Sequence, residues 1–290
     1  MVSGEEVLRH LQKINTKTKT NIIKNIDFIY LINLDKRADR LSRCLNQFAC
    51  YSILPHRVSA IYGWDLTQAA FNDIGLKILP SMSFDRPVHF GPVVRDAIGE
   101  WMTPSKVGKT CVHHTMAAGQ LGCSLSHLSV LVDAYHSSYE TIWVLEDDFT
   151  INDPPEELGV YIEKLNALVG PSEWDLLYTD NDDHFSLPTV RDIMGGGNLG
   201  RPEMPMTNAL IEHRKVGSNF VKIGGRTQTH SMIIRKSGIK KIVEFLLKNG
   251  LFRPIDIELS FVPGLKLYNL MHDAVHGRDR TDSDTYYRKS

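Results

Sequence analysis

Two continuous apolar runs of strand length do most to constrain the fold of this chain, Phe28–Leu34 and Thr141–Glu146. Both are rich in β-branched and aromatic residues, which is typical of strands covered on both faces. The first run precedes apolar residues at helical spacing over 41–48, and the second follows such a segment over 121–135. Alternating buried strands and amphipathic helices predict an α/β fold with a largely parallel sheet flanked by helices.

The same alternation continues toward the C-terminus. Helical spacing over 160–168 precedes a short apolar strand at 174–178, and a strand at 231–234 precedes a helix over 238–247. We therefore predict a single domain over 25–290.

Three segments do not fit this alternation. Residues 1–24 combine apolar residues at helical spacing with a Lys/Thr-rich stretch, which predicts a peripheral helical extension and linker. Residues 78–118 and 181–226 lack clear periodicity, and long irregular segments in a compact domain are commonly active-site loops. We expect these two segments to form loops at an active site.

Composition excludes several classes of function. The 290 residues include 33 basic and 34 acidic side chains, so the net charge of −1 gives no overall attraction to nucleic acid. No stretch approaches the roughly 18 to 20 apolar residues of a membrane-spanning helix. No signal peptide is evident, and four irregularly spaced cysteines predict neither a disulfide scaffold nor structural zinc. We expect a soluble, cytoplasmic protein whose oligomeric state the sequence leaves open.

The sharpest chemical feature is the run of acidic residues Glu146, Asp147 and Asp148 at the end of the second apolar strand. Ligands of open α/β sheets bind at the carboxyl ends of strands. Strand alternation directs Glu146 and Asp148 to one side and Asp147 to the other. Adjacent carboxylates suit Mg²⁺ or Mn²⁺ bound together with a diphosphate. The alternative is a solvated acidic turn.

Four motifs occur in an order that resembles glycosyltransferase family 25, which includes bacterial lipooligosaccharide and collagen hydroxylysine galactosyltransferases. They are INLDKRADR at 32–40, VSAIYG at 58–63, GCSLSH at 122–127 and LEDD at 145–148. Weaker matches at 174–178, 237–238 and 254–256 extend the resemblance over roughly residues 27–284.

The resemblance implies a GT-A (Rossmann-like) fold with a mixed, mostly parallel sheet, and an inverting, metal-dependent transferase. The implied donor is a UDP-sugar, commonly UDP-galactose, and the acceptor a hydroxyl group, for example on a lipid-linked glycan of lipopolysaccharide biosynthesis. By the same resemblance, Asp148 binds the metal, while Glu146 or Asp147 contacts the ribose or the donor sugar. Glu146 is also a candidate metal ligand.

The residues after the first strand are candidates for nucleotide binding. Arg37 and Arg40 are placed to pair with uracil, ribose or phosphate, while Asn33 and Leu34 contact the nucleotide mainly through backbone atoms. The alternative is that at least one arginine forms a salt bridge with a neighbouring aspartate.

Ser126 and His127 occupy a side of the 121–135 helix that differs from its leucines. His127 is a candidate donor to a phosphate or carboxylate, and the alternative is a buried histidine that supports the loops. Cys123 lies four residues earlier, but no acyl-transfer context favours a Cys/His nucleophile pair.

An inverting transfer requires a carboxylate base for the acceptor hydroxyl. Asp256, in the motif Pro-Ile-Asp, is the first candidate, and a helix N-cap is the alternative role. Asp180, Asp182 and Asp183 are further candidates, in a stretch where the chain departs from the family pattern.

The polar segment near the C-terminus offers further ligands. His272 or His276 is expected to complete the metal shell, and Arg278 and Arg280 to hold the diphosphate. The alternative is a solvated tail, although Ser283-Asp284 resembles a late motif of the family.

Two other classes of function compete with the transferase. The acidic cluster also suits a metal-dependent phosphohydrolase or nuclease, although the arginines and the 122–127 motif argue against it. A nucleotide-sugar-binding protein without catalytic activity would result if the base were missing.

Overall fold

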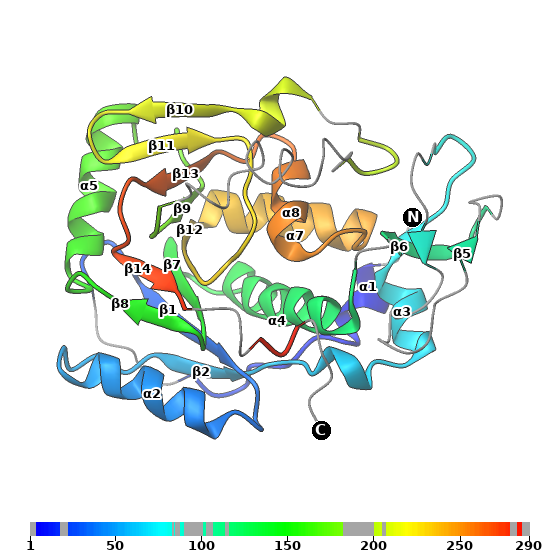
Figure 1. Ribbon diagram of the computed structural model, residues 1–290, viewed down its shortest axis with the longest axis horizontal. Helices are drawn as coiled ribbons and strands as arrows, with labels where there is room; N and C mark the ends of the chain where they lie inside the picture. The colour runs from blue at the N-terminus through cyan, green and yellow to red at the C-terminus, as the bar shows by residue number, and fades with distance from the viewer. Residues whose placement is uncertain are drawn as a thin grey trace.

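A mixed β-sheet forms the centre of the structure (Figure 1). The computed structural model describes residues 4–17, 23–82, 84, 88–89, 101–102, 107–113, 116–181, 200–204, 207–278 and 283–285. In sheet order the strands are β10 (His213–Val216), β11 (Phe220–Ile223), β13 (Leu267–Leu270), β9 (Leu176–Tyr178), β12 (Ser231–Arg235), β7 (Thr141–Glu146), β1 (Phe28–Asn33) and β2 (His56–Ser59).

Most of these strands point the same way. β1 pairs in parallel with β2 and β7, and β9 pairs in parallel with β13. β12 is antiparallel to both β7 and β9, and β11 is antiparallel to β10 and β13. This confirms the predicted mixed, mostly parallel sheet of a Rossmann-like, GT-A-type fold. The reversal of β12 brings its first residues to the edge where β7 ends.

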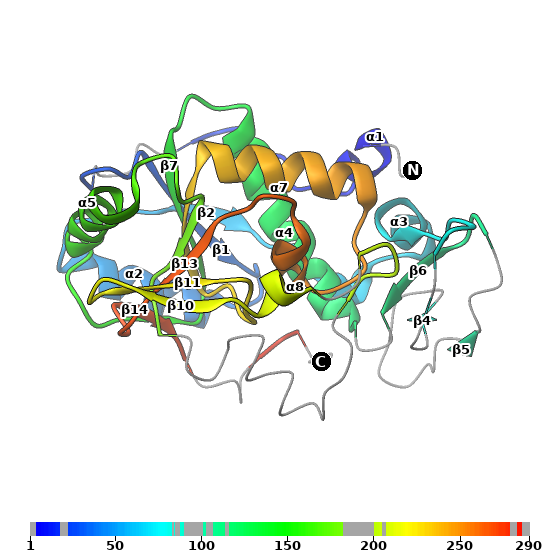
Figure 2. The ribbon, with the colours of Figure 1, turned by 90° about the horizontal axis from the view of Figure 1, so that it is seen from above.

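Helices cover both faces of the sheet, as Figure 2 shows. Tyr30 and Val144 point to the face covered by α4 (Ala118–Tyr135) and α7 (Lys236–Asn249). The next side chain along each strand, Leu31 and Leu145, points to the face covered by α2 (Ala38–Ala49) and α5 (Glu157–Val169). Side-chain alternation along fully buried strands thus produces two apolar layers, one on each side of the sheet.

Smaller elements complete the structure. A second sheet lies beside α1 (Gly4–Leu8) and α3 (Gln68–Ile74), at the right of Figure 1. Its strands are β3 (Leu76–Lys77), β6 (Thr110–His113), β4 (Val88–His89) and β5 (Trp101–Met102). The other short elements are η1 (Gly63–Asp65), β8 (Phe149–Ile151), η2 (Asn208–Ile211), α8 (Ile255–Glu258), η3 (Leu259–Phe261) and β14 (Val275–Gly277).

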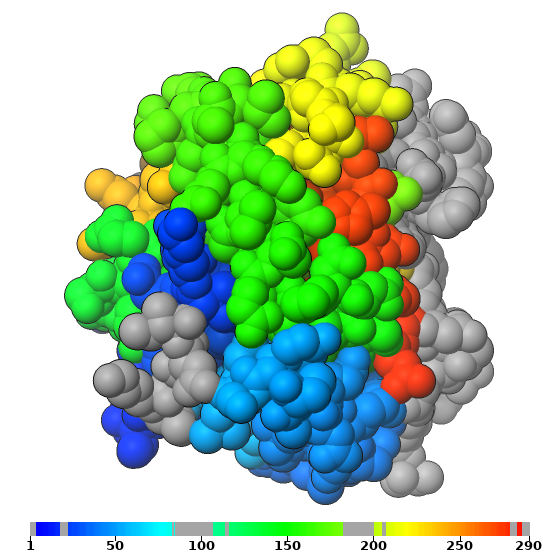
Figure 3. Space-filling model, turned by 90° about the vertical axis from the view of Figure 1, so that its left-hand side faces the viewer, coloured from blue at the N-terminus to red at the C-terminus, as the bar shows by residue number. Residues whose placement is uncertain are grey.

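Strand β14 lies against the segment that follows the acidic cluster. It pairs antiparallel with β8, and Gly277 is opposite Phe149. In Figure 3, the orange-red segment that contains β14 lies beside the green surface of β8 and α5. The C-terminal part of the chain therefore covers the turn between β7 and β8.

The N-terminal segment packs onto the domain. Val7 is 1% exposed and joins the apolar layer that includes α4 and α7. His10 Nε2 lies 2.7 Å from Asp73 Oδ2 of α3, and the backbone N–H of Gln12 donates to Ser129 Oγ of α4. The helix in this N-terminal segment is shorter than predicted, because α1 ends at Leu8 although apolar residues continue at helical spacing beyond it.

The two segments without clear periodicity contain short strands. β6 lies within 78–118, and the β10–β11 hairpin lies within 181–226. β10 is a largely exposed edge strand, so its side chains show no apolar alternation that could have predicted it. In the part of the chain that the structure describes, no helix is long and apolar enough to cross a membrane.

Candidate functional site

Polar side chains converge where β1 and β7 end side by side. Asp147 and Asp148 form the turn between β7 and β8, directly after Glu146. A pocket opens at this edge. Its lining includes Asn33, Leu34, Arg40, Tyr62, Gly63, Cys123, Ser126, all three acidic residues and Ser283–Thr285. The carboxyl ends of parallel strands are where open α/β sheets bind ligands.

Asp147 faces the first βα unit. Its carboxylate accepts hydrogen bonds from Arg40 Nη1 at 2.8 Å and from Asn33 Nδ2 at 2.7 Å. Burial raises the pKa of Asp147 despite the opposing effect of these two donors. Through these hydrogen bonds, Asn33 connects β1, and Arg40 connects α2, to the turn after β7. The predicted contacts of these three residues with a nucleotide stay predictions.

Glu146 and Asp148 contact histidines instead of Arg40 and Asn33. This agrees with the strand alternation, which predicts Glu146 and Asp148 on one side and Asp147 on the other. Together with His230, Glu146 and Asp148 place ligand atoms within 4.8 Å of one another. His230 Nδ1 lies 2.8 Å from Asp148 Oδ1, and Thr229 Oγ1 donates to Glu146 Oε1 at 2.6 Å. The two carboxylates suit Mn²⁺ or Mg²⁺, and the imidazole is typical of transition-metal sites, so the set fits Mn²⁺ better than Mg²⁺.

The backbone explains why His230 is here. Glu146 N–H donates to the His230 carbonyl at 2.9 Å, which extends the antiparallel pairing of β7 and β12 by one step. Burial lowers the pKa of His230, but the charge and hydrogen bond of Asp148 and the charge of Glu146 outweigh burial and raise it to about 9. Sequence reasoning missed His230. Only the direction of β12 could have revealed it, because a parallel strand would place this residue at the opposite edge.

Glycine at position 277 leaves room for the His230 ring. A Cβ atom there would lie 2.1 Å from His230 Cδ2. The next residue, Arg278, donates its backbone N–H to the Asp148 carbonyl at 2.7 Å, while its side chain is exposed. Gly277 thus lies close to the His230 ring, and the residue after β14 holds the backbone of Asp148. The expected contact of the Arg278 side chain with a diphosphate stays a prediction.

The predicted bases are held by other groups. Asp256 accepts hydrogen bonds from the backbone N–H groups of Gln228 and Ile257, both at 2.8 Å. Gln228 has a φ of 74°, an uncommon conformation for a non-glycine residue. Asp180 forms a buried, two-point ion pair with Arg226. These contacts give both carboxylates a structural role, and their catalytic role stays a prediction.

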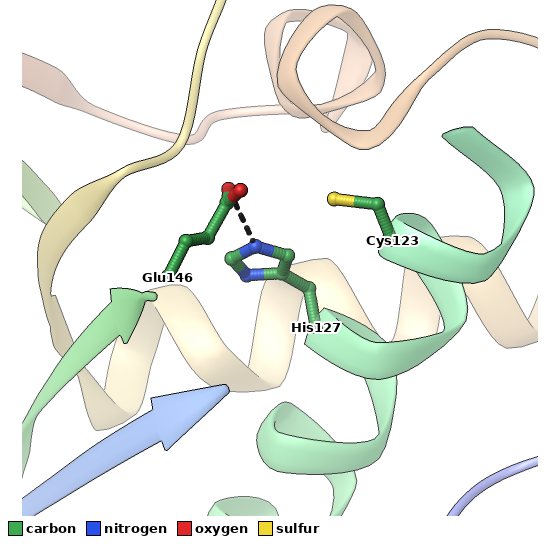
Figure 4. A group of neighbouring side chains, drawn as sticks. All are labelled: Cys123, His127 and Glu146. Carbon is green, nitrogen blue, oxygen red and sulfur yellow. Dashed lines mark hydrogen bonds and ion pairs between the residues drawn. The ribbon is translucent and has the colours of Figure 1, made fainter. Parts of the chain in front are cut away.

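Residues of α4 pack next to Glu146. His127 is 1% exposed, and its Nε2 atom lies 3.0 Å from Glu146 Oε1. Figure 4 shows Cys123, one turn earlier on the helix, pointing toward the same carboxylate. His127, Thr229 and His230 oppose the effect of burial on Glu146 and lower its pKa. Ser126 Oγ does not contact this carboxylate among the interactions described; it accepts a hydrogen bond from the backbone N–H of Ile61 at 2.8 Å. This bond holds the pocket-lining residue Ile61 against α4.

The segment Ser283–Thr285 lies against the start of α4. Asp284 forms an ion pair with Arg37 and accepts a hydrogen bond from Trp64 Nε1 at its carbonyl oxygen. A Cβ at Gly119 would lie 2.4 Å from the Thr285 carbonyl oxygen, so glycine permits this close approach. Arg37 also pairs with Asp39, as the alternative interpretation of the sequence anticipated.

The structure does not bring the predicted late histidines to the acidic cluster. His272 Nε2 lies 2.8 Å from Asp153 Oδ2 and 3.1 Å from Tyr161 OH, beside α5. His276 lies in β14, where its Nδ1 atom contacts the Gly277 carbonyl. Among the described residues, neither belongs to a group of potential metal ligands, and His230 stands where a third ligand was expected.

Three predicted site residues, Asp182, Asp183 and Arg280, lie outside the described residues. Their roles therefore stay predictions. Leu34 lines the pocket, and its carbonyl accepts the backbone N–H of Arg37 at 2.9 Å.

The mixed, GT-A-type sheet thus carries acidic residues at the carboxyl end of β7, where they face a pocket. A sequence profile described as glycosyltransferase family 25 (LPS biosynthesis protein) matches residues 26–256. The chain belongs to this family.

Curated relatives agree with the family at low identity. A glycosyltransferase 25 family member of Drosophila pseudoobscura pseudoobscura is 25% identical over 173 residues, 59% of this chain and 23% of the relative. Procollagen galactosyltransferase 1-B of Xenopus laevis is 27% identical over 159 residues, 53% of this chain and 21% of the relative. The human inactive glycosyltransferase 25 family member 3 is 25% identical over 154 residues, 52% and 21% of the two chains. The matched region thus spans less than a quarter of each relative.

Proposed function

We propose that this glycosyltransferase moves a sugar from a UDP-sugar to a hydroxyl acceptor, with a divalent cation held by Glu146, Asp148 and His230. The observation that carries the proposal is the convergence of these three ligand atoms within 4.8 Å beside a pocket. A bound Mn²⁺ or Mg²⁺ would neutralise the charge that develops on the leaving nucleoside diphosphate.

The pocket next to this triad suits the nucleoside part of the donor. Ile32, Ala60, Ile61 and Tyr62 give it an apolar wall, while Asn33 and Asp147 give it polar groups. A largely apolar pocket with a few placed polar groups is the usual form of a cofactor site. The side chain of Arg37 stands at the edge of this region, beside Asp284.

Galactose is the sugar we propose, because one group of relatives is named procollagen galactosyltransferase. The acceptor we propose is a glycan, in line with the family description, which refers to LPS biosynthesis. We further propose inversion at the anomeric carbon, with Asp256 or Asp180 as the carboxylate base. Each carboxylate accepts two hydrogen bonds in the structure, and its oxygens have further lone pairs that could accept the proton of an acceptor hydroxyl.

The test is a thermal-shift and donor-hydrolysis panel of UDP-galactose, UDP-glucose, UDP-N-acetyl sugars and a GDP-sugar, each with and without Mn²⁺. A donor at about 100-fold over its Kd should stabilise the fold by roughly 2.7 kcal/mol. A manganese-dependent shift with a UDP-sugar supports the proposal, and UDP-galactose should give the largest shift. A response to no donor under either condition contradicts it. Release of free phosphate from generic esters would indicate a phosphohydrolase instead.

A non-catalytic nucleotide-sugar-binding protein is the second candidate. It is favoured by the existing partners of Asp256 and Asp180 and by the relatives named inactive. This candidate predicts a manganese-dependent thermal shift with a UDP-sugar but neither transfer nor hydrolysis. Donor hydrolysis that disappears in Asp148→Asn would exclude it.

A further inference from the structure

A second cluster of potential cation ligands lies beside the first and shares Glu146 with it. Cys123 Sγ, a ring nitrogen of His127 and a Glu146 carboxylate oxygen lie within 4.8 Å of one another. Figure 4 shows the Cys123 and His127 side chains on the side of α4 that faces Glu146. We infer that these three side chains form a binding site for a soft divalent cation of the Zn²⁺ type, separate from the proposed Glu146–Asp148–His230 site.

The ligand types distinguish the two sites. Thiolate sulfur selects soft or borderline cations, whereas carboxylate-rich sets select Mg²⁺, Ca²⁺ or Mn²⁺. Zn²⁺ accepts Cys, His and Glu ligands in tetrahedral geometry, and three protein ligands leave a fourth position open. Cys123 and Glu146 both line the pocket, so the open position faces a space that water or a small ligand can enter.

The three side chains come from rigid elements. Cys123 and His127 are four residues apart on α4, a spacing that places them on one face of a helix. Glu146 ends β7, and Thr229 Oγ1 holds its Oε1 atom at 2.6 Å. The contact of 3.0 Å between His127 Nε2 and Glu146 Oε1 is the one that a cation would replace.

His127 also bounds the affinity of this site. Its second ring nitrogen, Nδ1, is buried, and it has no hydrogen-bond partner among the described residues. Metal-binding histidines usually donate this second N–H to a carbonyl or carboxylate, and losing that support typically weakens binding about 10- to 100-fold. We therefore expect reversible binding by an ion that chelators remove, and not a tightly held structural zinc.

Sharing Glu146 has a consequence for the proposed function. A cation bound by Cys123 and His127 would use the Glu146 carboxylate, which the Asp148–His230 site also needs. Zn²⁺ should therefore inhibit a Mn²⁺-dependent transfer, and this part of the inference rests on the proposed function. Binding of the soft cation itself does not depend on that function.

Titration with Co²⁺, used as a spectroscopic substitute for Zn²⁺, tests the site directly. Coordination of Co²⁺ by a thiolate gives a near-ultraviolet charge-transfer band, whereas oxygen and nitrogen ligands do not. We expect this band in the wild-type protein, its displacement by Zn²⁺ and its loss in Cys123→Ser. It should persist in Cys50→Ser, which removes an exposed thiol elsewhere. Absence of the band from the wild type, or its persistence in Cys123→Ser, overturns the inference.

Two more variants separate this site from the proposed function. Asp148→Asn should keep the cobalt–thiolate band even if it loses all transfer, because Asp148 belongs to the other group. His127→Gln should weaken the band while the circular dichroism spectrum confirms folding. If no UDP-sugar binds under any condition but the band behaves as expected, the proposed function fails and the soft-cation site stands. If the band is lost in Asp148→Asn, the two sites are not separate and the inference fails.

Discussion

The three consecutive acidic residues at the end of β7 have three different environments. Asp147 is buried against Arg40 and Asn33, whereas Glu146 contacts His127 and Asp148 contacts His230. The turn after Glu146 and the alternation along the strand separate them. Asp147 thus connects structural elements, and Glu146 and Asp148 are the two that we propose to bind a cation.

Asp148→Asn keeps the size of the side chain and removes its charge. On the proposed mechanism, we expect the rate of manganese-dependent transfer to fall by roughly 10³-fold, because a bound metal contributes several kcal/mol to transition-state stabilisation. The matched control is Asp153→Asn, which changes an aspartate that contacts His272 beside α5. Steady-state rates at saturating donor measure both. Equal losses in the two variants would argue against a special role for Asp148.

The stability of the metal-free protein should depend on the protonation of His230. Its pKa of about 9 lies above the ordinary value of 6.5, so the imidazolium stabilises the folded state fully below about pH 6.5. This contribution, on the order of 3 kcal/mol, should be lost as the pH rises through 9. Urea unfolding in a chelator between pH 6 and 10 measures it. His230→Gln should remove this part of the pH dependence, and parallel curves for the two proteins would contradict the prediction.

At the scale of elements, two glycines set how closely α4 approaches the pocket wall. A Cβ at Gly122 would lie 2.4 Å from the Gly63 backbone nitrogen and 2.5 Å from the Ile61 carbonyl oxygen. Those neighbours are backbone atoms, so they cannot move aside as a flexible side chain does. The helix and the 61–63 segment therefore pack at backbone contact distance, which brings Ser126 within reach of Ile61.

Gly122→Ala should lower the free energy of unfolding by about 1–3 kcal/mol, because the inserted methyl group overpacks this contact. In an unconstrained helix the same change would stabilise by about 0.5–1 kcal/mol. Gly4→Ala is the control, since its Cβ would meet Leu247 at an ordinary distance of 3.6 Å. Chemical denaturation of both variants measures the effect. A Gly122→Ala protein as stable as the wild type would contradict the close approach.

The elements that could be predicted from the sequence are those with long apolar patterns. β1, β7, α4 and α7 have enough buried side chains for their periodicity to be evident. The β10–β11 hairpin was missed because its edge strand is short and mostly polar. The direction of β12 was missed for another reason, since a buried strand has the same apolar composition in either direction.

The candidate site, like the fold, was predictable only where its residues belong to a strand with a clear apolar pattern. Alternation along β7 placed Glu146 and Asp148 together and Asp147 apart, because those positions lie at the end of a well-defined strand. His230 could not be found, since its position depends on the direction of β12. The predicted late histidines failed to reach the cluster because His272 contacts Asp153 and His276 lies in a ladder with β8.

At the scale of the whole molecule, the N-terminal segment is packed against the same apolar layer as the main sheet. α1 contacts both α3 and α7, and Lys17 forms an ion pair with Asp133 of α4. The segment therefore connects α3, α4 and α7. Its contribution to stability can be measured separately from any effect on activity.

Val7→Ala should lower the free energy of unfolding by about 1–3 kcal/mol, because it removes two methyl groups from a packed core. Its neighbour Leu8 is 39% exposed, so Leu8→Ala is a matched control that should change stability by less than about 0.5 kcal/mol. Denaturant midpoints at constant slope measure both. Equal effects would mean that α1 does not pack on the domain in solution.

The antiparallel pairing of β12 with β7 also determines at which stage of folding the proposed site of Glu146, Asp148 and His230 can form. Asp148 and His230 are 82 residues apart in the chain, so no early fragment carries both ligands. Closing a flexible loop of that length costs on the order of 4 kcal/mol of chain entropy, which the pairing of β7 with β12 must offset. If the proposed site binds a cation, its binding during refolding should therefore report the pairing of β12 with β7. During synthesis, a cation that needs all three proposed ligands would be bound only after His230 has emerged from the ribosome.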